Sequence, residues 1–510
     1  MLSKICSTRA LLKLVKVPKS ALLCRGSVNS DVTSKLCGIS CRFISVSSTK
    51  WANQIHEKVD QIENELVHRE PWHWKKPEGH DTGVKIINSY RCLWQNKMPA
   101  SIPLIVKDPN YVTWYACGPT VYNSCHIGHA WTYLQFDLIR RILTEYFGLN
   151  ICLVMGITNM DNKIINKAML YDQGFMEVAD NFEQEFKEDM TALNVLPPTS
   201  YIRVTDVIPQ IISFIQSVID NDQAYVTERG NVYFSYNSSH QSIAKLRFEF
   251  FEPDSSVGEK RFPKDIALWK TPGPGEPYWD SPWGKGRPGW HIECSVMASM
   301  CFGSNVDFHS GANDLKFPHH EYEVAQCDSF HGCHQWINYF LHSGHMQIKK
   351  GIKMSKSLGN TITIRDYLNE FEDPDTLRML ACNTIWHKNF KYTEGITESA
   401  VNHIKLFSQF LSKYKRVIRG AENLIVDNAK VLEAVARCEA NMKEHFADNM
   451  SIRKAITELK NLIIEVKKSA AEDDTNKQIG NFCDVSAIMK LTNLFDKTFS
   501  NLGFTFHKKL

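Results

Sequence analysis

The chain has 510 residues, of which 43% are hydrophobic and 23% are charged, and a formal net charge of +3. This length suggests two to four domains, and the composition is that of a globular protein. The sequence has no apolar run near the roughly 20 residues that a membrane-spanning helix needs, and so small a net charge gives no argument for a nucleic-acid-binding surface over the whole molecule.

Residues 1–50 differ in composition from the rest of the chain. They contain nine lysines and arginines and a single acidic residue, Asp31, together with many serines and leucines. An acid-poor basic segment of this kind is typical of a mitochondrial transit peptide, whereas a secretory signal has a longer apolar stretch. We therefore expect a disordered leader that directs the protein to the mitochondrial matrix. A basic tail without a targeting role is the alternative.

An alternation of strands and helices begins after residue 110. Residues 111–117 (YVTWYAC) predict a buried strand, residues 118–120 (GPT) a turn, and the apolar spacing up to Leu143 a helix. A second apolar run, residues 151–157 (ICLVMGI), predicts another strand. This order is typical of the βαβ unit of a nucleotide-binding parallel sheet, so we expect an α/β protein with a Rossmann-type catalytic domain.

Composition divides the remainder of the chain. Residues 196–282, with prolines at one edge and the Pro/Gly/Trp-rich stretch TPGPGEPYWDSPWGKGRPGW near the other, predict a connective insertion between two halves of the catalytic domain, at 84–195 and 283–345. A charged loop opens the next segment, at 346–398. Beyond residue 399 apolar residues recur at spacings of three and four, which predicts an all-α domain to residue 510.

The tetrapeptide His126-Ile127-Gly128-His129 stands where the first strand leads into its helix. Backbone N–H groups and the helix dipole favour phosphate at such a place. Two imidazoles there can donate hydrogen bonds to a triphosphate as charge builds on it, and Gly128 permits close approach. Taken alone, two histidines that flank a glycine are more often loop or cap residues than phosphate ligands.

The pentapeptide Lys353-Met354-Ser355-Lys356-Ser357 is the second candidate element. Lysines on a mobile loop can neutralise the oxygens of a leaving pyrophosphate, and glycines flanking the loop allow it to close over ATP. A solvated basic turn is the alternative, and it would be preferred if the loop stood alone.

The two motifs in this order, followed by a helical tail, resemble the signature of the class I aminoacyl-tRNA synthetases. Three further segments resemble the cysteinyl-tRNA synthetase family in particular: residues 117–122 (CGPTVY), 289–295 (GWHIECS) and 314–323 (DLKFPHHEYE). The resemblance runs from about residue 84 to at least residue 392. It departs from the family at Trp131, where arginine is frequent, and at Asn166, where lysine is frequent.

The resemblance implies an ATP-dependent ligation of L-cysteine to tRNA(Cys) through a cysteinyl adenylate, with Mg²⁺ accompanying ATP, in mitochondrial translation. We expect a monomer with an all-α tRNA-binding domain and a stem-contact region within 346–398. The resemblance also implies residue roles: His126, His129, Lys353 and Lys356 on the triphosphate; Gly118, Thr158, Trp290 and His319 in the cysteine pocket; and His309, Gly311 and Asp314 on the adenylate side.

A metal site can be argued from residue types. His319 and Glu323 are four residues apart after a proline that suits a helix start, so both lie on one helix face, about 6 Å apart along the axis. Cys117 and Cys294 would complete a Cys₂HisGlu set typical of zinc. Spacing alone favours ordinary buried thiols, whereas the resemblance implies one Zn²⁺ held by these four residues, with His319 rather than His320 as the ligand.

Zinc gives a physical reason for choosing cysteine over serine. A thiol bound to zinc loses its proton near neutral pH and forms a strong bond, whereas an alcohol binds weakly, so no separate editing domain is expected. Two other functions remain open: a ligase of the same fold that couples cysteine to a small amine or sugar, and a non-catalytic RNA-binding relative.

Basic residues predict where RNA binds in the helical domain. They cluster on or near one amphipathic helix, although a solvated helix face explains them equally well: Lys405, Lys413, Lys415, Arg416 and Arg419.

Overall fold

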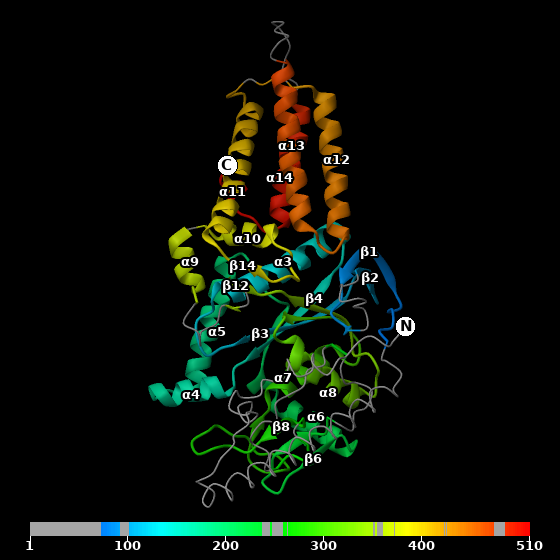
Figure 1. Cartoon of the computed structure of the whole chain (residues 1–510), viewed down its shortest axis with the longest axis vertical. Helices are drawn as coiled ribbons and strands as arrows, with labels where there is room; N and C mark the ends of the chain where they lie inside the picture. The colour runs from blue at the N-terminus through cyan, green and yellow to red at the C-terminus, as the bar shows by residue number, and fades with distance from the viewer. Residues whose placement is uncertain are drawn as a thin grey trace, which may run out of the picture. The chain divides into compact units, whose positions relative to one another are not determined.

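The structure is a computed structural model (Figure 1). It describes residues 73–91, 101–236, 245–246, 259–262, 264–349, 352–353, 361–371, 373–422, 424, 426–473 and 485–510, with the backbone alone for 348–349, 352–353 and 470–473. The expected leader, residues 1–50, lies outside the described residues. None of the helices in the described part of the chain has the length and apolar character needed to cross a bilayer.

A five-stranded parallel sheet forms the centre of the catalytic region. Its strand order is β11-β10-β3-β4-β5, and every neighbouring pair is parallel. The strands are β3 (Val112–Thr120), β4 (Ile151–Thr158), β5 (Ser200–Arg203), β10 (Val306–Ala312) and β11 (Ile337–Ser343). The predicted α/β class with a parallel sheet is confirmed, and the two strands expected from the runs at 111–117 and 151–157 both belong to this sheet.

Alternating side chains of β3 enter two different cores. Trp114 and Ala116 pack into the core beneath α3 (Ile127–Phe147), while Tyr115 and Cys117 pack into the core on the opposite face. Successive residues of a strand point to opposite faces, so the sulfur of Cys117 faces away from α3. That second face is covered by α6 (Ile208–Asp220), α7 (Trp290–Phe302) and α8 (Glu321–His331). Figure 1 shows α7 and α8 beside this sheet.

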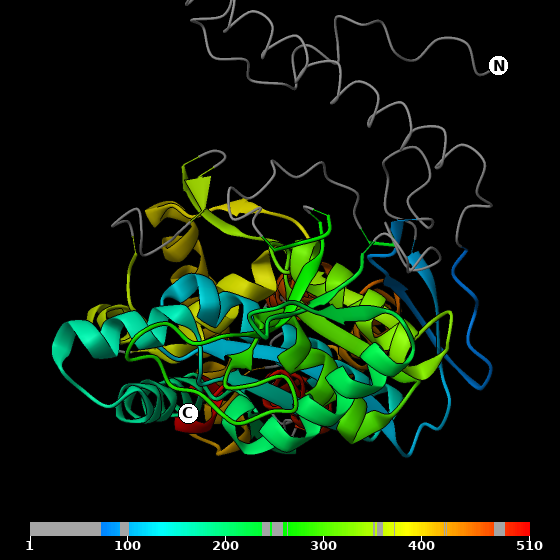
Figure 2. The same ribbon diagram turned by 90° about the horizontal axis from the view of Figure 1, so that it is seen from below.

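The region 196–282 contributes to two sheets. Its first strand, β5, pairs with β4 in the central sheet. The following strands of this region are β6 (Ala224–Val226), β7 (Val232–Phe234) and β8 (Ile266–Lys270). They form a four-stranded antiparallel sheet with β9 (Arg287–Pro288), which lies beyond the expected end of the insertion at residue 282. Seen from below, this green region lies in front of the cyan strands of the central sheet (Figure 2). The antiparallel sheet is therefore a separate layer, whereas residues 200–203 belong to the catalytic sheet.

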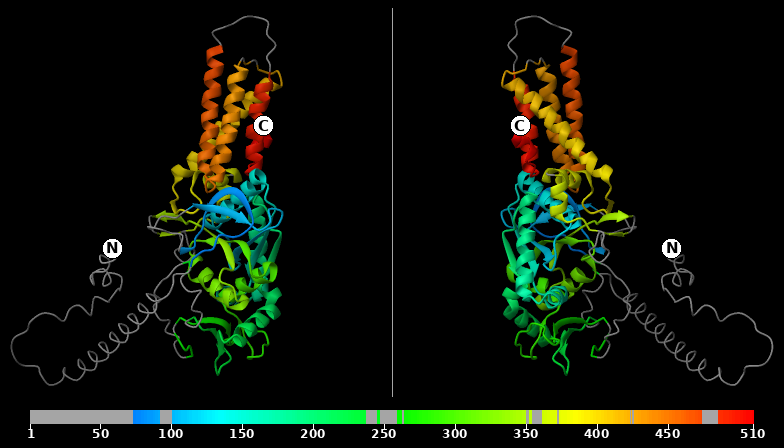
Figure 3. Two further views of the ribbon diagram at one scale, coloured as in Figure 1. Left: turned by 90° about the vertical axis from the view of Figure 1, so that its right-hand side faces the viewer. Right: turned by 90° about the vertical axis from the view of Figure 1, so that its left-hand side faces the viewer.

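Helices follow each half of the sheet and fill the C-terminal part of the chain. The βα connections include α4 (Asn162–Tyr171) and α5 (Phe175–Ala192). The C-terminal helices are α9 (Ile364–Phe371), α10 (Pro374–Asn383), α11 (Glu394–Ile418), α12 (Asn428–Ala447), α13 (Ile452–Asp473) and α14 (Ser486–Asn501). Figure 3 shows α11–α14 standing together, extending away from the green antiparallel sheet. Their apolar faces share one core with α3.

Two small sheets complete the fold. A hairpin precedes the central sheet, formed by β1 (His80–Ile87) and β2 (Ser101–Val106). A three-stranded sheet lies around the segment that leads into the KMSKS loop, formed by β12 (Met346–Lys349), β13 (Ile352–Lys353) and β14 (Phe390–Lys391).

Candidate active site

A cavity of about 510 Å³ lies at the carboxyl ends of β3, β4 and β10. Ligands of open α/β sheets bind at this edge. Of the residues expected to bind substrate or metal, nine line the cavity: Cys117, Gly118, His126, His129, Thr158, Trp290, Cys294, Asp314 and His319. The structure thus brings together residues from five separate segments of the chain.

The two histidines of the HIGH motif form the cap of α3. His126 is the N-cap, and its Nδ1 accepts a hydrogen bond from the backbone N–H of His129 at 3.3 Å. In return, Nδ1 of His129 accepts from the backbone N–H of His126 at 3.3 Å, and the two rings are stacked with centroids 3.8 Å apart. Because Nδ1 accepts in each neutral ring, the proton lies on Nε2, which can donate to an anionic oxygen. The two histidines can therefore cap α3 and also donate hydrogen bonds to phosphate.

The chain that follows the KMSKS loop is attached to the HIGH turn. The backbone N–H of Ile127 donates to the carbonyl of Ile362 at 3.0 Å, and the N–H of Ile364 donates to the carbonyl of Cys125 at 3.1 Å. Lys356 and the side chain of Lys353 lie outside the described residues, although the backbone of Lys353 ends β13. The two signature motifs are thus linked through the segment just beyond the loop.

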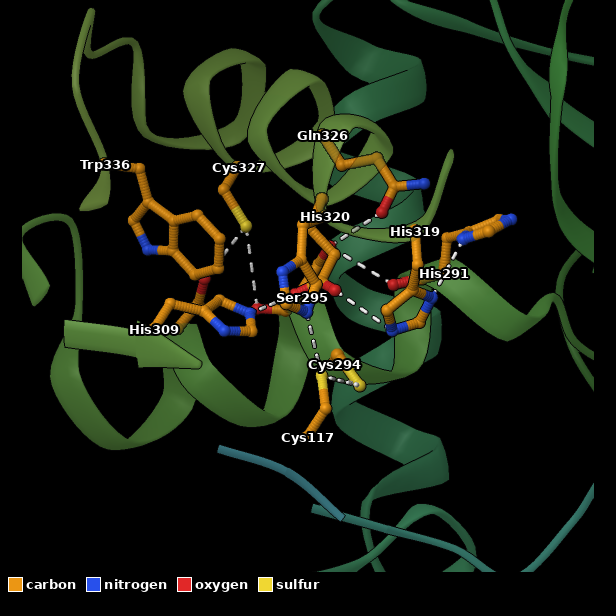
Figure 4. Close-up of polar contacts among 12 residues, drawn as sticks. Cys117, His291, Cys294, Ser295, His309, His319, His320, Gln326, Cys327 and Trp336 are labelled. Carbon is orange, nitrogen blue, oxygen red and sulfur yellow. Dashed lines mark hydrogen bonds and ion pairs between the residues drawn. The ribbon is translucent and has the colours of Figure 1, made fainter. Parts of the chain in front are cut away.

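Four donor atoms converge at the wall of the cavity. The sulfurs of Cys117 and Cys294 are 3.8 Å apart, and Nε2 of His319 lies 3.0 Å from Oε1 of Glu323. Ligand atoms of all four residues lie within 4.8 Å of one another, and all four residues are buried. Cys117 comes from β3, Cys294 from α7 and His319 from the turn before α8 (Figure 4). Glu323 comes from α8. This set of two sulfurs, one imidazole and one carboxylate fits a single divalent metal such as zinc.

A second donor set overlaps the first. It consists of Cys117, His309, His320 and Glu323, also within 4.8 Å of one another. His309 and His320 are fully buried and are not among the cavity-lining residues, whereas Cys294 and His319 line the cavity. A metal that takes part in substrate binding keeps one position open to the substrate. The set with Cys294 and His319 meets that requirement, because three of its donors lie on the cavity wall.

Neighbouring histidines, of which His309 and His320 are buried and His291 is partly buried, support the donors. Nδ1 of His291 lies 3.0 Å from Nδ1 of His319, and Nε2 of His309 lies 2.8 Å from Oε2 of Glu323. Nε2 of His320 lies 3.3 Å from the sulfur of Cys117. Such partners fix the orientation of metal ligands and raise their basicity.

Three histidines of this cluster have no role predicted from the sequence: His291, His320 and His342. Nε2 of His342 lies 2.7 Å from Nδ1 of His320. Two signals were available. His291 and His320 lie within the family-like segments, and His342 is an ionisable residue in the buried strand INYFLHS. A titratable side chain in a fully buried strand is unusual unless it has a polar partner.

The two sulfurs influence each other's protonation. Burial raises the pKa of Cys117 well above its ordinary value. The hydrogen bond from Cys117 lowers the pKa of Cys294 well below its ordinary value. The pair therefore releases one proton readily and the second with difficulty, and a divalent cation can take the place of that second proton.

The wall expected to bind cysteine is built from close packing. Gly118 leaves no room for a side chain, since a Cβ atom there would lie 2.2 Å from the carbonyl oxygen of Gly156. Trp290 is 39% exposed, and its ring centroid lies 4.5 Å from that of His319. Thr158 ends β4, and its Oγ1 lies 3.5 Å from a carboxyl oxygen of Glu293. These residues border the side of the cavity where the metal donors lie.

Of the three residues expected on the adenylate side, one lines the cavity and two do not. Asp314 lines the cavity, and its Oδ1 lies 3.9 Å from Nε2 of His345. His309 is fully buried against Glu323, and Gly311 lies under the ring of His320. His309 and Gly311 are not among the residues that line the cavity, and their contact with ATP stays a prediction.

Three of the five basic residues expected to contact RNA have partners within the chain. Lys415 donates to Asp496 at 3.1 Å, Arg416 to Glu422 at 2.9 Å, and Arg419 to the carbonyl of Leu510 at 3.2 Å. Lys405 and Lys413 are exposed on α11. The basic surface of this helix is therefore narrower than its sequence suggests.

Known proteins provide an independent comparison. A family described as the catalytic domain of class I tRNA synthetases (C) matches residues 104–402. A probable mitochondrial cysteine-tRNA ligase of Xenopus tropicalis is 46% identical over 396 residues, which cover 76% of this chain and 68% of the relative. A cytoplasmic cysteine-tRNA ligase of Dictyostelium discoideum is 40% identical over 432 residues, covering 80% and 64%. The chain thus spans about two thirds of the length of these relatives.

Solved structures of other synthetases share the fold. Methionyl-tRNA synthetase of Mycobacterium tuberculosis with methionyl-adenylate superimposes with a TM-score of 0.57 at 14% identity, over 77% of this chain and 90% of that one. A leucyl synthetase complex of Agrobacterium radiobacter gives a TM-score of 0.55 at 10% identity, over 78% and 84%. At these identities the likeness concerns the fold alone.

Proposed function

Since the chain belongs to the cysteine-tRNA ligase family of class I aminoacyl-tRNA synthetases, we propose that it joins L-cysteine to tRNA(Cys) through a cysteinyl adenylate, with zinc recognition of the cysteine thiol, in the mitochondrial matrix. The observation that carries the proposal is the convergence of Cys117, Cys294, His319 and Glu323 within 4.8 Å of one another beside the cavity. Family membership supports the ligase reaction, and the donor set supports the choice of amino acid.

These four residues would hold Zn²⁺, and the donor types fit it: two thiols, one imidazole and one carboxylate in a buried site. Bound zinc would supply a strong, selective bond to a substrate thiolate that serine cannot form. The protein itself shapes the pocket around that position. Gly118 allows the backbone of β3 to approach β4, and the indole of Trp290 closes one side.

His126 and His129 act on the triphosphate in this proposal. Their Nε2–H groups donate to phosphate oxygens at the N-terminus of α3, where the helix dipole also favours negative charge. The cysteine carboxylate attacks the α-phosphorus of ATP, which arrives with Mg²⁺, and pyrophosphate leaves. Lys353 and Lys356 neutralise the leaving group, and the hydrogen bonds of Ile362 and Ile364 attach the segment just after residue 360 to the HIGH turn.

In the second step a ribose hydroxyl of the terminal adenosine of tRNA attacks the adenylate carbonyl, and AMP leaves. No covalent enzyme intermediate is required. The exposed lysines 405 and 413 of α11 are the candidates for contact with RNA phosphates.

Cysteine-dependent ATP–pyrophosphate exchange tests the proposal. We expect exchange with cysteine, at least about 100-fold less with serine, and loss of the cysteine reaction after zinc is removed with a chelator. Zinc added back should restore it. Charging of tRNA(Cys) measured in parallel separates the ligase from an enzyme that transfers cysteine to a small amine. Exchange that does not distinguish cysteine from serine, or that survives complete removal of the metal, would contradict the proposed recognition.

A further inference from the structure

Arg378 of α10 is a fully buried charge that has no part in the chemistry above. Its guanidinium donates four hydrogen bonds. One goes to Oδ2 of Asp137 at 2.6 Å. The other three go to backbone carbonyls, of Leu502 at 3.0 Å, Leu193 at 2.8 Å and Asn194 at 2.7 Å. The side chain therefore connects four segments that are far apart in the sequence.

The three carbonyls lie at the C-terminal ends of two helices. Leu193 is the C-cap of α5 and Leu502 is the C-cap of α14. Carbonyls at a helix C-terminus lack partners within the helix and form the negative end of its dipole, which favours a cation there. The planar guanidinium reaches several such acceptors in fixed directions, whereas an ammonium group does not. Arg378 thus fixes the ends of α5 and α14 relative to each other.

Asp137 extends the same network to α3. It lies on the helix that begins with the HIGH motif, about 12 Å along the axis from His129. Its carboxylate also accepts from Nε of Arg141 at 2.8 Å and from the backbone N–H of Leu196 at 2.9 Å. The helix that carries the catalytic histidines is therefore bonded, through one carboxylate, to the arginine that holds α14.

The segment beyond α14 is held in the same place. Oδ2 of Asp375, at the start of α10, accepts from the backbone N–H groups of Thr505 at 2.8 Å and Phe506 at 2.6 Å. A Cβ atom at Gly503 would lie 2.7 Å from Cζ of Arg141 and 2.9 Å from Nη1 of Arg378. The contact leaves no space for even a methyl group without displacing both guanidinium groups.

A continuous path leads from the candidate RNA contacts to the HIGH motif. Helix α11, which carries Lys405 and Lys413, packs on α14 through Phe407 and Phe499, whose ring centroids are 5.1 Å apart. From the end of α14 the path continues through Arg378 and Asp137 to α3.

Apolar side chains of equal volume can replace a buried ion pair without loss of stability. The guanidinium contributes fixed directions between helices, which an apolar contact lacks.

From this geometry we propose that Arg378 is a positioning residue that couples the tRNA-binding helices to the catalytic helix α3. The inference rests on the proposed function. Arg378 transmits the placement of bound tRNA to the HIGH end of α3, so it acts on the transfer of cysteine to tRNA more than on the activation of cysteine.

Arg378→Lys in the full chain tests the coupling, because it keeps the positive charge and removes the planar guanidinium group that donates in several fixed directions. We expect the kcat/KM for tRNA(Cys) charging to fall at least about tenfold, while cysteine-dependent ATP–pyrophosphate exchange stays within about twofold of wild type. Leu491→Val in the buried face of α14 provides a control for lost stability. At an equal decrease in Tm, this variant should lower neither reaction at the assay temperature.

If Arg378→Lys does not fold, Asp137→Asn provides a second variant, because it keeps the volume of the side chain and removes the charge that faces Arg378. It should alter the ratio of charging to exchange in the same direction. Parallel losses in both reactions, or unchanged charging in either variant, would overturn the coupling and leave Arg378 with a structural role. A wild-type chain that performs exchange but charges no tRNA(Cys) would contradict the proposed function itself, and this inference with it.

Discussion

At the residue scale, the candidate metal site depends on polar groups that are not themselves on the cavity wall. Glu323 offers one carboxylate oxygen toward His319, while its other oxygen is bonded to His309 at 2.8 Å. The imidazole of His309 therefore decides which way the carboxylate faces. Burial raises the pKa of Glu323, and the neighbouring histidines lower it, so removing His309 should leave a carboxyl that holds its proton more tightly.

His309→Ala should weaken zinc binding about 10- to 100-fold, the usual effect of losing such a supporting group. Competition with a chromogenic chelator measures the affinity without any activity assay. His331→Ala is the matched control, because His331 bonds to Ser299 and is not part of either donor set. Equal zinc affinity in the His309 variant and the wild type would show that Glu323 orients itself without help.

Gly118→Ala should disturb the wall of the proposed cysteine pocket. The new methyl group would lie 2.2 Å from the carbonyl oxygen of Gly156, so β3 and β4 would have to separate at that point. We expect the KM for cysteine in exchange to rise at least about tenfold, with a lower Tm.

Gly395→Ala is the control for a glycine replaced without a clash. No atom lies within 4 Å of a Cβ there, and Gly395 lies inside α11, where alanine is favoured by up to about 1 kcal/mol. This variant should keep wild-type kinetics and a Tm no lower than that of wild type. A normal KM for cysteine in Gly118→Ala would show that Gly118 does not belong to the proposed cysteine pocket.

At the element scale, the hydrophobic pattern of the sequence predicted the central strands β3 and β4 but not the edge strand β5 that pairs with β4. The runs at 111–117 and 151–157 became β3 and β4 because both faces of each strand are buried. Strand β5 was not expected, since Ser200–Arg203 is short and half exposed and pairs only at a sheet edge. The periodicity of apolar residues indicates which residues are buried. Pairing at a sheet edge depends instead on which backbone groups of the neighbouring strand are still unpaired.

The site was predictable to the extent that family-like motifs named its residues. The four metal donors were identified in this way, and the structure places them together. The histidines behind them, and the bonds of Arg378 to two helix ends, depend on contacts between distant segments. No local pattern in α10 distinguishes a buried arginine from a solvated one, so the polar network around Arg378 could not be predicted.

Helix α5 carries a carboxyl group whose titration should be measurable. Asp189 is nearly buried, and burial raises its pKa to about 6 despite the bond to Arg365. The unfolded value is about 4, so the folded state holds this proton more tightly than the unfolded state. Asp189 therefore contributes stability below about pH 4, and this contribution is lost as the pH rises through 6.

Asp189→Asn should remove part of that pH dependence. Between pH 4.5 and 7.5 the wild type should lose about 1 kcal/mol of unfolding free energy relative to the variant, since solvent beside the exposed Arg365 also stabilises the ionised carboxylate and reduces the effect. Urea unfolding at the two pH values measures it. Glu188→Gln, which removes the exposed partner of the same arginine, should retain the wild-type loss. Identical slopes for wild type and Asp189→Asn would rule out the raised pKa.

At the scale of the whole molecule, the basic segment 1–50 is expected to determine location and not catalysis. Fused to a fluorescent protein, it should direct import into mitochondria, and replacing Arg9, Lys13 and Lys16 by glutamate should prevent import. A chain lacking residues 1–50 should keep cysteine-dependent exchange. Cytosolic fluorescence of the unaltered fusion would contradict the targeting role.

The order of strands in the central sheet also determines when each strand can pair with its neighbour during synthesis of the chain. Strand β3 ends at Thr120, yet its neighbour β10 begins at Val306, and the metal donors Cys294 and Glu323 arrive in the same late part of the chain. At a synthesis rate of roughly 5 to 20 residues per second, one edge of β3 waits about 10 to 40 s for its partner. An unpaired hydrophobic edge invites aggregation. The nascent chain is therefore exposed to this hazard over that interval, and the four candidate metal donors can meet only after α8 has been made.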